Sequence, residues 1–414
     1  MKTPQTAVAV AEQKSKLLTI IILGLLTAVV PFSIDMYLPG FTDIARTYNT
    51  TTTKVALSLS SFFIGMGIGQ LLYGPLLDRF GRKRPLFAGL TLYLLASFAC
   101  AWAPSIDLLI GARFVQAMGG CAATIAATAM VRDLFAAQDS AKVFSYLILV
   151  LSVSPLLAPT TGSLLTSTLG WRSIFFALSI VTALIFVLSY FYLPQAKGPD
   201  HRYSLQPRAI LKNYGAVLRH AYFNIYALIG AIAFAGLFVY IASSPGIFME
   251  QYHLTQKQYG LLFAFLASGL ILASQVNTLL LKRFSSEKII SISFALQLVI
   301  AVLYFGLAKA AAPTMALTIG FLFLFLSATG LVMPNATALA MKPFEENAGS
   351  ASALLGFVQM SLGSIATVVI GILNIQSSLL MVACMSGGSA IATLLLMLSG
   401  KRGRAKTLNM WAIN

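Results

Sequence analysis

The chain has 414 residues, of which 58% are hydrophobic and only 10% are charged, and its formal net charge is +16. A mean hydropathy of +0.84 excludes a soluble domain of this size and indicates a polytopic membrane protein. The excess of bases is spread over alternate loops and does not form one soluble face, so we expect no nucleic-acid partner.

Apolar stretches of about 20 residues, the length that crosses a bilayer as a helix, recur along nearly the whole chain. Because these stretches are continuous and do not alternate with polar residues, they favour helices over the strands of a membrane barrel. The predicted spans are 17–38, 55–77, 85–103, 108–131, 141–165, 171–193, 222–245, 258–281, 288–308, 313–336, 348–373 and 377–399. We therefore expect an all-α membrane protein of twelve transmembrane helices.

The distribution of bases predicts the orientation of these spans. With the N-terminus in the cytoplasm, most of the 28 Lys and Arg fall in cytoplasmic segments, as the positive-inside rule requires. The bases left outside are Arg46, Lys54, Arg172, Lys257 and Lys309. Both termini are therefore expected in the cytoplasm. The first span is too long for the core of a signal peptide, so we expect it to remain as the first helix.

The longest polar break, residues 194–221, divides the spans into six and six. A faint repeat supports this division, because Leu77-Asp78-Arg79-Phe80 recurs 204 residues later as Leu281-Lys282-Arg283-Phe284. The predicted organisation is two related six-helix bundles with a linker between them and a short segment at each end. Its parts are a cytoplasmic segment 1–16, an N-terminal bundle 17–193, the linker 194–221, a C-terminal bundle 222–399 and a cytoplasmic tail 400–414.

A polar hairpin joins the second and third spans, with the sequence Gly74-Pro-Leu-Leu-Asp78-Arg79-Phe-Gly81-Arg82-Lys-Arg84. Its bases hold the hairpin in the cytoplasm, and its glycines are expected to permit a sharp turn and close helix packing. The segment resembles the loop 2-3 signature of the major facilitator superfamily. Turning and anchoring the chain would by itself explain the motif.

The resemblance implies an added gating role for this hairpin. Asp78 would lie near a neighbouring helix N-terminus or pair with Arg132 at the cytoplasmic end of the fourth span, and so stabilise one conformer of a transporter. The residues expected in this gate are Gly74, Asp78, Arg79, Gly81, Arg82 and Arg132.

Two charged residues are predicted to lie within the membrane, Arg113 in the fourth span and Asp35 near the outer end of the first. Arg113 begins a segment that resembles the span-four pattern of the same superfamily. An arginine in a span costs about 2.5 to 3.5 kcal/mol on insertion scales, so it usually faces a cavity and has a partner. Asp35 is the available partner. Arg113 has a simpler alternative, in which its side chain snorkels to the outer surface. Asp35 has two: it takes part in a purely structural ion pair, or it is a carboxylate at a helix end that water reaches from outside.

Asp35 and Arg113 together outline a proton-coupling site. Desolvation disfavours the charged carboxylate and a nearby guanidinium favours it, so Asp35 could exchange protons as its access alternates between two compartments.

The fifth span contains Pro155, Pro159 and Gly162 in an otherwise apolar run, and the prolines are expected to bend it. This pattern departs from the usual Gly-Pro form of the superfamily's antiporter motif and is similar to the variant in the Bcr/CflA drug-resistance branch. The segments Asp35-Met-Tyr37-Leu-Pro and Gly170-Trp-Arg-Ser-Ile-Phe-Phe point to the same branch.

This resemblance implies a proton antiporter that exports drugs or other small amphipathic compounds. It also implies that the protein works as a monomer in the inner membrane of a bacterium. Its partners would be a small-molecule substrate, protons and the lipid bilayer. Aromatic, Met and other side chains from several spans would line the substrate cavity. The expected cavity residues are Tyr37, Gln116, Tyr146, Phe234, Tyr240, Phe357 and Gln359.

Other function classes find little support in the sequence. It has no phosphate-binding loop, no metal-ligand spacing and no soluble catalytic constellation, so we expect no enzyme, no cofactor and no metal site. The three cysteines, Cys100, Cys121 and Cys384, are expected to be packing residues within spans. Two alternatives stay open: a dedicated exporter of one metabolite, such as a nucleoside, sugar or siderophore, and a membrane sensor that transports nothing.

Overall fold

The computed structural model describes residues 4–196, 198–199, 206–310, 313–344, 348–373 and 377–411, and its regular elements over these residues are all helical. Twelve helices among them are long and apolar enough to cross a membrane. Large apolar side chains such as Leu95, Ile180 and Leu303 are exposed on the outer surface of the bundle, as expected for a surface that meets lipid.

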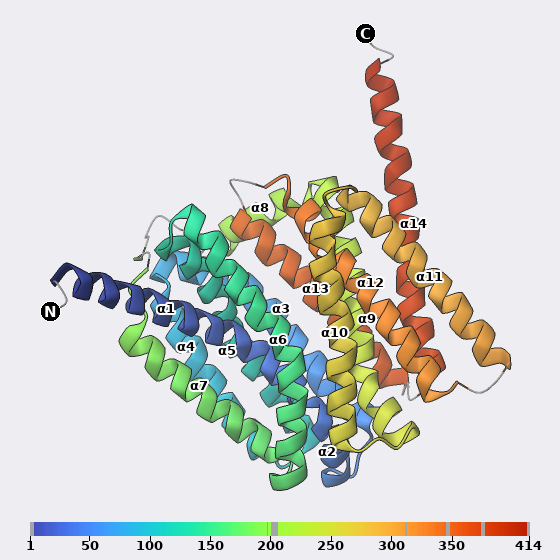
Figure 1. Ribbon diagram of the computed structural model, residues 1–414, viewed down its shortest axis with the longest axis horizontal. Helices are drawn as coiled ribbons and strands as arrows, with labels where there is room; N and C mark the ends of the chain where they lie inside the picture. The colour runs from blue at the N-terminus through green and yellow to red at the C-terminus, as the bar shows by residue number, and fades with distance from the viewer. Residues whose placement is uncertain are drawn as a thin grey trace.

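The first half of the chain contains six of these spans and two short elements between the first and second. Its helices are α1 (Pro4–Asp35), the 3₁₀ turn η1 (Leu38–Gly40), α2 (Phe41–Thr47), α3 (Thr52–Phe80), α4 (Lys83–Ala101), α5 (Ile106–Leu134), α6 (Ala137–Leu169) and α7 (Arg172–Tyr192). The chain then reaches α8 (Pro207–Leu218), a short helix that lies across one end of the molecule (Figure 1).

The second half repeats the same order of long helices. Its helices are α9 (Ala221–Pro245), the π-helical segment η2 (Gly246–Gln251), α10 (Gln256–Leu280), α11 (Ser286–Ala310), α12 (Met315–Met341), α13 (Ala348–Leu373) and α14 (Ser378–Trp411). We call the two ends of the bundle the α2 end and the α8 end, after the short helices found there (Figure 1).

The helix N-caps agree with the predicted repeat. Thr51 caps α3 by accepting a hydrogen bond from the backbone N–H of Lys54, and Thr255, 204 residues later, caps α10 in the same way from Gln258. Two caps at equivalent places in the two halves support the interpretation of the chain as two related six-helix bundles.

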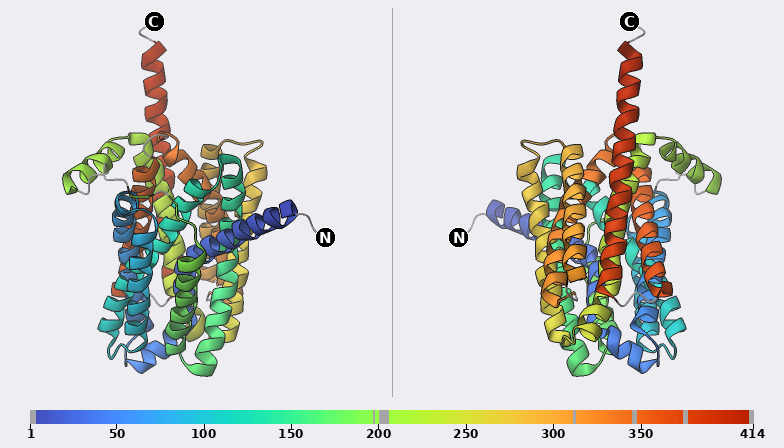
Figure 2. Two further views of the ribbon diagram at one scale, coloured as in Figure 1. Left: turned by 90° about the vertical axis from the view of Figure 1, so that its left-hand side faces the viewer. Right: turned by 90° about the vertical axis from the view of Figure 1, so that its right-hand side faces the viewer.

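Most predicted spans are confirmed to within a few residues, but the observed helices differ from the predicted segments in three places. The predicted first span, 17–38, ends as a helix at Asp35 and continues into η1 and α2. The linker 194–221 contains the amphipathic helix α8, and α14 continues to Trp411 through most of the expected tail. In Figures 1 and 2 the last part of α14 projects beyond the bundle at the α8 end, and the first part of α1 projects sideways.

Small residues allow α4 and α5 to pack backbone against backbone. A Cβ placed on Gly119 of α5 would collide with the backbone nitrogen of Tyr93 and would lie 2.6 Å from the carbonyl oxygen of Gly89, both in α4. Gly111, two turns earlier in α5, has nothing within 4 Å of its Cβ position. The two glycines therefore differ in packing although they lie on the same helix.

Substituting Gly119 should destabilise the bundle, whereas the same change at Gly111 should not. We expect Gly119→Ala to lower the free energy of unfolding by about 1 to 3 kcal/mol, because α4 and α5 would have to separate. The midpoint of thermal unfolding of the detergent-purified protein measures the effect, with Gly111→Ala as the matched control. Equal midpoints for the two variants would contradict this packing.

Candidate functional site

Arg113 of α5 is fully buried in the first half and is held by polar and aromatic groups. Its Nη1 donates to Oε1 of Gln116 at 2.5 Å, and its Nη2 donates to the backbone oxygen of Ser33 in α1 at 3.0 Å. The guanidinium carbon lies 4.2 Å from the ring centre of Phe62 and 4.7 Å from that of Tyr37. Cation–π attraction in a desolvated site therefore takes the place of a counter-ion.

The bond to Ser33 satisfies a carbonyl at the C-terminal end of α1. The helix tightens there, because the N–H of Tyr37 donates to Ile34 and leaves the oxygen of Ser33 for Arg113. A cation at a helix C-terminus also interacts favourably with the helix dipole. Arg113 thus fixes where α1 ends relative to α5, and the last residue of α1 is Asp35.

The predicted contact between Asp35 and Arg113 is wrong. Over the residues that the structure describes, no hydrogen bond or ion pair joins their side chains, although both are buried. The carboxylate of Asp35 lies within electrostatic range of Tyr240 and Tyr259 in the second half. Arg113 instead meets the end of α1 through the backbone oxygen of Ser33, two residues before Asp35.

Tyr259 and Tyr240 lie next to each other in the second half. The hydroxyl of Tyr259 shares a 2.8 Å hydrogen bond with the hydroxyl of Ser244 in α9, and the ring of Tyr240 stacks on Phe263 of α10. Sequence reasoning selected Tyr240 as an aromatic residue but missed Tyr259. The spacing of residues along a helix shows which side chains share a face, but it does not show which distant helix that face will contact. No sequence signal therefore pointed to Tyr259.

The residues expected to line the substrate cavity lie in different parts of the structure. Tyr37 and Gln116 are fully buried around Arg113 and are not exposed to a cavity in this structure, so their assignment to the substrate cavity stays a prediction. They have the polar partners that a buried site requires: the hydroxyl of Tyr37 shares a hydrogen bond with Ser58, and Nε2 of Gln116 donates to Ser97.

Of the remaining cavity residues, two are partly exposed near the boundary between the halves. Phe357 of α13 faces Gly67 of α3, and Phe234 contacts Phe238, whose ring stacks at 3.7 Å on Phe63 of α3. Gln359 faces Gly230 of α9 inside the second half, Tyr240 is buried near Asp35, and Tyr146 lies in the first half between α6 and α1.

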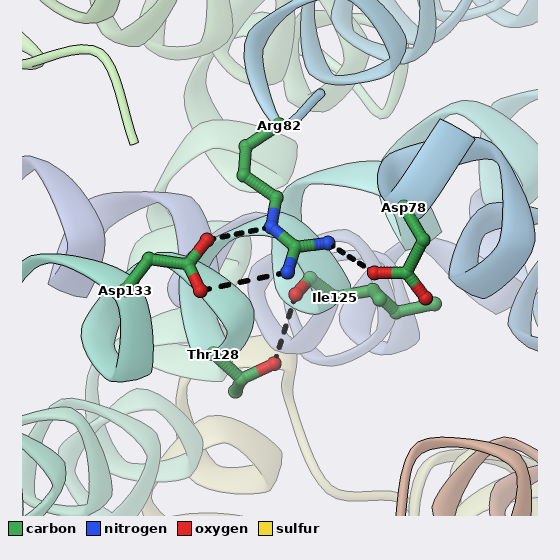
Figure 3. A network of polar contacts seen from close by, with 5 residues as sticks. All are labelled: Asp78, Arg82, Ile125, Thr128 and Asp133. Carbon is green, nitrogen blue, oxygen red and sulfur yellow. Dashed lines mark hydrogen bonds and ion pairs between the residues drawn. The ribbon is translucent and has the colours of Figure 1, made fainter. Parts of the chain in front are cut away.

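The polar hairpin at the α8 end forms a three-residue ion network (Figure 3). Arg82 donates from Nη1 to Asp78 at 2.6 Å and from Nε to Asp133 of α5 at 2.7 Å. Burial opposes the charged form of Arg82, but the hydrogen bonds and charges of Asp133 and Asp78 outweigh this effect and raise the pKa of the guanidinium above its ordinary value. The network ties the hairpin to the end of α5.

Two expectations for this hairpin require correction. The partner of Asp78 is Arg82, and the acidic residue contributed by α5 is Asp133, next to the expected Arg132, which is exposed. Gly81 makes the turn with φ +79°, a conformation that favours glycine, but Gly74 lies inside α3 with nothing within 4 Å of its Cβ position. Gly74 is therefore neither a turn nor a close contact. Arg79 has a partner in the structure.

Pro155 and Pro159 lie inside the continuous helix α6, at the segment where α6 meets its neighbours. A Cβ on Gly162 would collide with the backbone of Met36 just after α1, and one on Gly260 of α10 would lie 3.1 Å from the carbonyl oxygen of Pro159. This segment therefore packs both on the end of the first span and on the second half. The predicted bend stays a prediction.

The two halves are in contact at the α2 end. Nε2 of Gln256 in α10 donates to the carboxylate of Asp43 in α2 at 2.7 Å. Deeper in the molecule, Ser60 of α3 donates to Thr367 of α13 at 2.6 Å. A cavity of about 580 Å³ lies between α2 and η2 at this end, and both halves contribute to its walls. Asp35 lies just inside this closed end, because α1 ends there.

Comparisons with known proteins agree with this architecture. A model of the Major Facilitator Superfamily matches residues 23–368. Among solved structures, the chain resembles the nucleoside transporter NupG with a TM-score of 0.73 at 13% identity, over 93% of this chain and 99% of that one. It also resembles the xylose transporter XylE from E. coli with a TM-score of 0.72 at 14% identity, over 92% and 98%. These likenesses show the fold alone.

Curated relatives are similar along most of their length. An uncharacterized MFS-type transporter, YdgK of Bacillus subtilis, is 31% identical over 87% of this chain and 90% of its own. A bicyclomycin resistance protein homolog of Haemophilus influenzae is 29% identical over 86% and 89%, and a chloramphenicol resistance protein of Pseudomonas aeruginosa is 28% identical over 86% and 84%. The chain is thus a multi-pass membrane transporter, and it belongs to the Major Facilitator Superfamily, in the Bcr/CflA drug-resistance branch.

Proposed function

We propose that this transporter exports small amphipathic compounds, drugs among them, in exchange for protons, and that Asp35 carries the proton. The observation that carries the proposal is the position of Asp35: a buried carboxylate without a cationic partner among the described residues, in the first half and facing tyrosines of the second. A buried charge without a partner is costly, so protonation of Asp35 and closure of the site around it are coupled.

The orientation that fits this proposal places the α8 end in the cytoplasm of a bacterium and the α2 end outside its inner membrane. Basic residues gather in the segments at the α8 end, among them Arg82, Lys83 and Arg84, in agreement with the positive-inside rule. Both termini then lie in the cytoplasm, and the contact between Asp43 and Gln256 closes the outer end.

In the proposed cycle, Asp35 takes a proton from outside while the outer end is open. Rocking of the two halves then closes the outer end and gives Asp35 access to the cytoplasm, where release of the proton favours substrate loading. An electrogenic step would gain about 2.3 kcal/mol per elementary charge per 100 mV in addition to the pH gradient.

Arg113 acts in this scheme by positioning α1 and does not carry the proton. Its bond to Ser33 holds the end of α1, and the aromatic rings around it hold the guanidinium. The bridge from Arg82 to Asp78 and Asp133 would act as a gate at the cytoplasmic end, because it fixes the hairpin after α3 to the end of α5.

The direct test of proton coupling is Asp35→Asn, which keeps the shape of the side chain and removes its titration. We expect proton-coupled export to be abolished while folding and insertion are intact. Everted vesicles energised to an acidic interior report export as dequenching of a pH dye when antibiotics, dyes or nucleosides are added. The matched control is Asp107→Asn, which removes an exposed carboxylate paired with Lys54. Full pH-dependent export by Asp35→Asn would exclude the coupling role.

The same assay separates drug export from export of one metabolite. Dequenching by several unrelated compounds would identify a multidrug antiporter, and a response to one chemical class would identify a dedicated exporter. Silence across the panel, with the protein shown to be inserted, would count against transport coupled to protons.

Substitutions of Arg113 should lower both the free energy of unfolding and the export activity, and Arg113→Ala should have a larger effect than Arg113→Lys. Arg113→Lys keeps the charge but loses the planar fork that reaches Gln116 and Ser33 at once. Arg113→Ala also leaves a void among the rings, with an expected loss of about 2 to 5 kcal/mol in the free energy of unfolding. Thermal unfolding and vesicle export measure the two effects. A variant Arg113→Ala that behaved like the unmodified protein would contradict the positioning role.

A covalent link across the closed outer end should stop the cycle. We expect the double variant Asp43→Cys, Gln256→Cys to lose most of its export after treatment with a short thiol-specific cross-linker, because the two halves must separate there in each cycle. Each single-cysteine variant under the same treatment is the control. Unchanged export by the fully cross-linked protein would show that this end does not open during transport.

A further inference from the structure

A hydrogen bond joins the linker helix α8 to the first half of the molecule. The hydroxyl of Tyr214 in α8 donates to the backbone oxygen of Leu71 in α3 at 3.0 Å. Leu71 lies in the part of α3 nearer the α8 end, because α3 runs from Thr52 near α2 to Phe80 at the polar hairpin. The proposed transport cycle assigns no role to this bond.

The oxygen of Leu71 needs a donor from outside its own helix. In an α-helix the carbonyl of a residue accepts from the N–H of the residue four positions later. For Leu71 that residue is Pro75, which lies inside α3 and has no backbone N–H. A backbone oxygen left without a partner inside a membrane protein is costly, so the hydroxyl of Tyr214 supplies the bond that Pro75 cannot make.

The second half satisfies a similar oxygen in a different way. Pro245 lies inside α9 and leaves the oxygen of Ile241 without its helical partner. The hydroxyl of Ser244, in the same helix, donates to that oxygen at 3.3 Å. A local hydroxyl is therefore sufficient for this purpose, whereas the donor for Leu71 comes from the linker. The bond from Tyr214 thus affects how α3 lies relative to α8, in addition to completing α3.

Tyr214 is fastened to the second half. The side chains of Tyr214 and Val217 are 8% and 2% exposed, and they belong to a hydrophobic cluster with Phe223 of α9 and Leu354 of α13. The backbone of α8 also lies close to α9 and α13. The side chain of Leu71 packs against the same cluster from the first half. The bond between Tyr214 and Leu71 therefore crosses the boundary between the halves.

We propose that α8 is a latch, in which the hydroxyl of Tyr214 holds the oxygen that Pro75 leaves open in α3 and so keeps the halves together toward the α8 end. The bond must break before this end opens to the cytoplasm. Because Pro75 lies three residues before Asp78, its release also frees the segment of α3 that leads into the polar hairpin. The latch rests on the rocking of the halves in the proposed function, and it is independent of proton coupling.

The distance between two spin labels at the α8 end tests the latch without substrate or a pH gradient. The labels are placed on Arg84→Cys and Lys342→Cys, exposed positions at this end of the first and second halves. Cys384 is replaced by Ser, and the other native cysteines are fully buried. Pulsed electron resonance on the full chain in detergent then reports the ratio of the long-distance population, with the end open, to the short-distance population, with the end closed.

Tyr214→Phe keeps the aromatic ring and removes the donor. We expect it to raise the ratio of open to closed populations about twofold to tenfold, the effect of one hydrogen bond. The matched control is Tyr222→Phe, which removes a hydroxyl that bonds to Glu287 within the second half. We expect the control to leave the ratio unchanged.

Pro75→Ala tests whether the carbonyl of Leu71 is the acceptor. This variant restores the N–H that the helix lacks, so the oxygen of Leu71 gains a donor of its own. We expect Tyr214→Phe to change the ratio in the unmodified chain and to change it little when Pro75→Ala is also present. This non-additivity distinguishes a latch on the freed carbonyl from a packing role of the tyrosine ring.

Four outcomes would overturn the proposal. The first is a lack of the short-distance population in the unmodified protein, and the second is an unchanged ratio in Tyr214→Phe, even if its unfolding midpoint falls. An equal change in Tyr222→Phe would show a general effect of lost hydroxyls. A full effect of Tyr214→Phe in the presence of Pro75→Ala would show that the freed carbonyl is not the acceptor that matters. None of these outcomes bears on proton coupling, which the vesicle assay tests separately.

Discussion

The arrangement of the first half depends on how one buried cation, Arg113, is held. Arg113 lies where water is excluded, and its guanidinium is held by a backbone oxygen of α1, by the amide of Gln116 and by the faces of aromatic rings. An unpaired charge at this depth would be costly, so each of these contacts restricts how α1, α3 and α5 can pack. The end of α1, and with it the place of Asp35, follows from that restriction.

The second half has a polar cluster of its own, and it is neutral. Gln297 of α11 donates to Thr329 of α12 and accepts from Ser389 of α14. Amides and hydroxyls can join helices in a membrane without the desolvation cost of a charge. The two halves therefore share a fold and differ in chemistry: the first holds the buried charge, and the second presents tyrosines to Asp35 across the boundary.

The contacts at the two ends of the bundle also differ in kind. At the α2 end the halves meet through the hydrogen bond between Asp43 and Gln256 and through small residues that allow helices to approach closely, and deeper in the molecule Ser60 bonds to Thr367. At the α8 end the network of Arg82, Asp78 and Asp133 lies within the first half. Rigid-body rocking requires the contacts between the halves at the α2 end to break, while the contacts within each half can persist.

The sequence by itself determined the class of the protein, the number and approximate limits of its spans and the division into two halves, because continuous apolar runs and polar breaks are local properties that the bilayer selects directly. It also singled out Asp35 and Arg113, since charges within spans are rare. Only the tertiary structure decided what those charges contact. Asp35 and Arg113 lie at similar depth, but the rotation of each helix about its axis is set by packing against several neighbours, and it directs Arg113 to Ser33 and Asp35 to the other half. The partner of Asp78 was decided in the same way, because a turn at Gly81 brings Arg82 back over α3 and against Asp133, and no local pattern encodes that return.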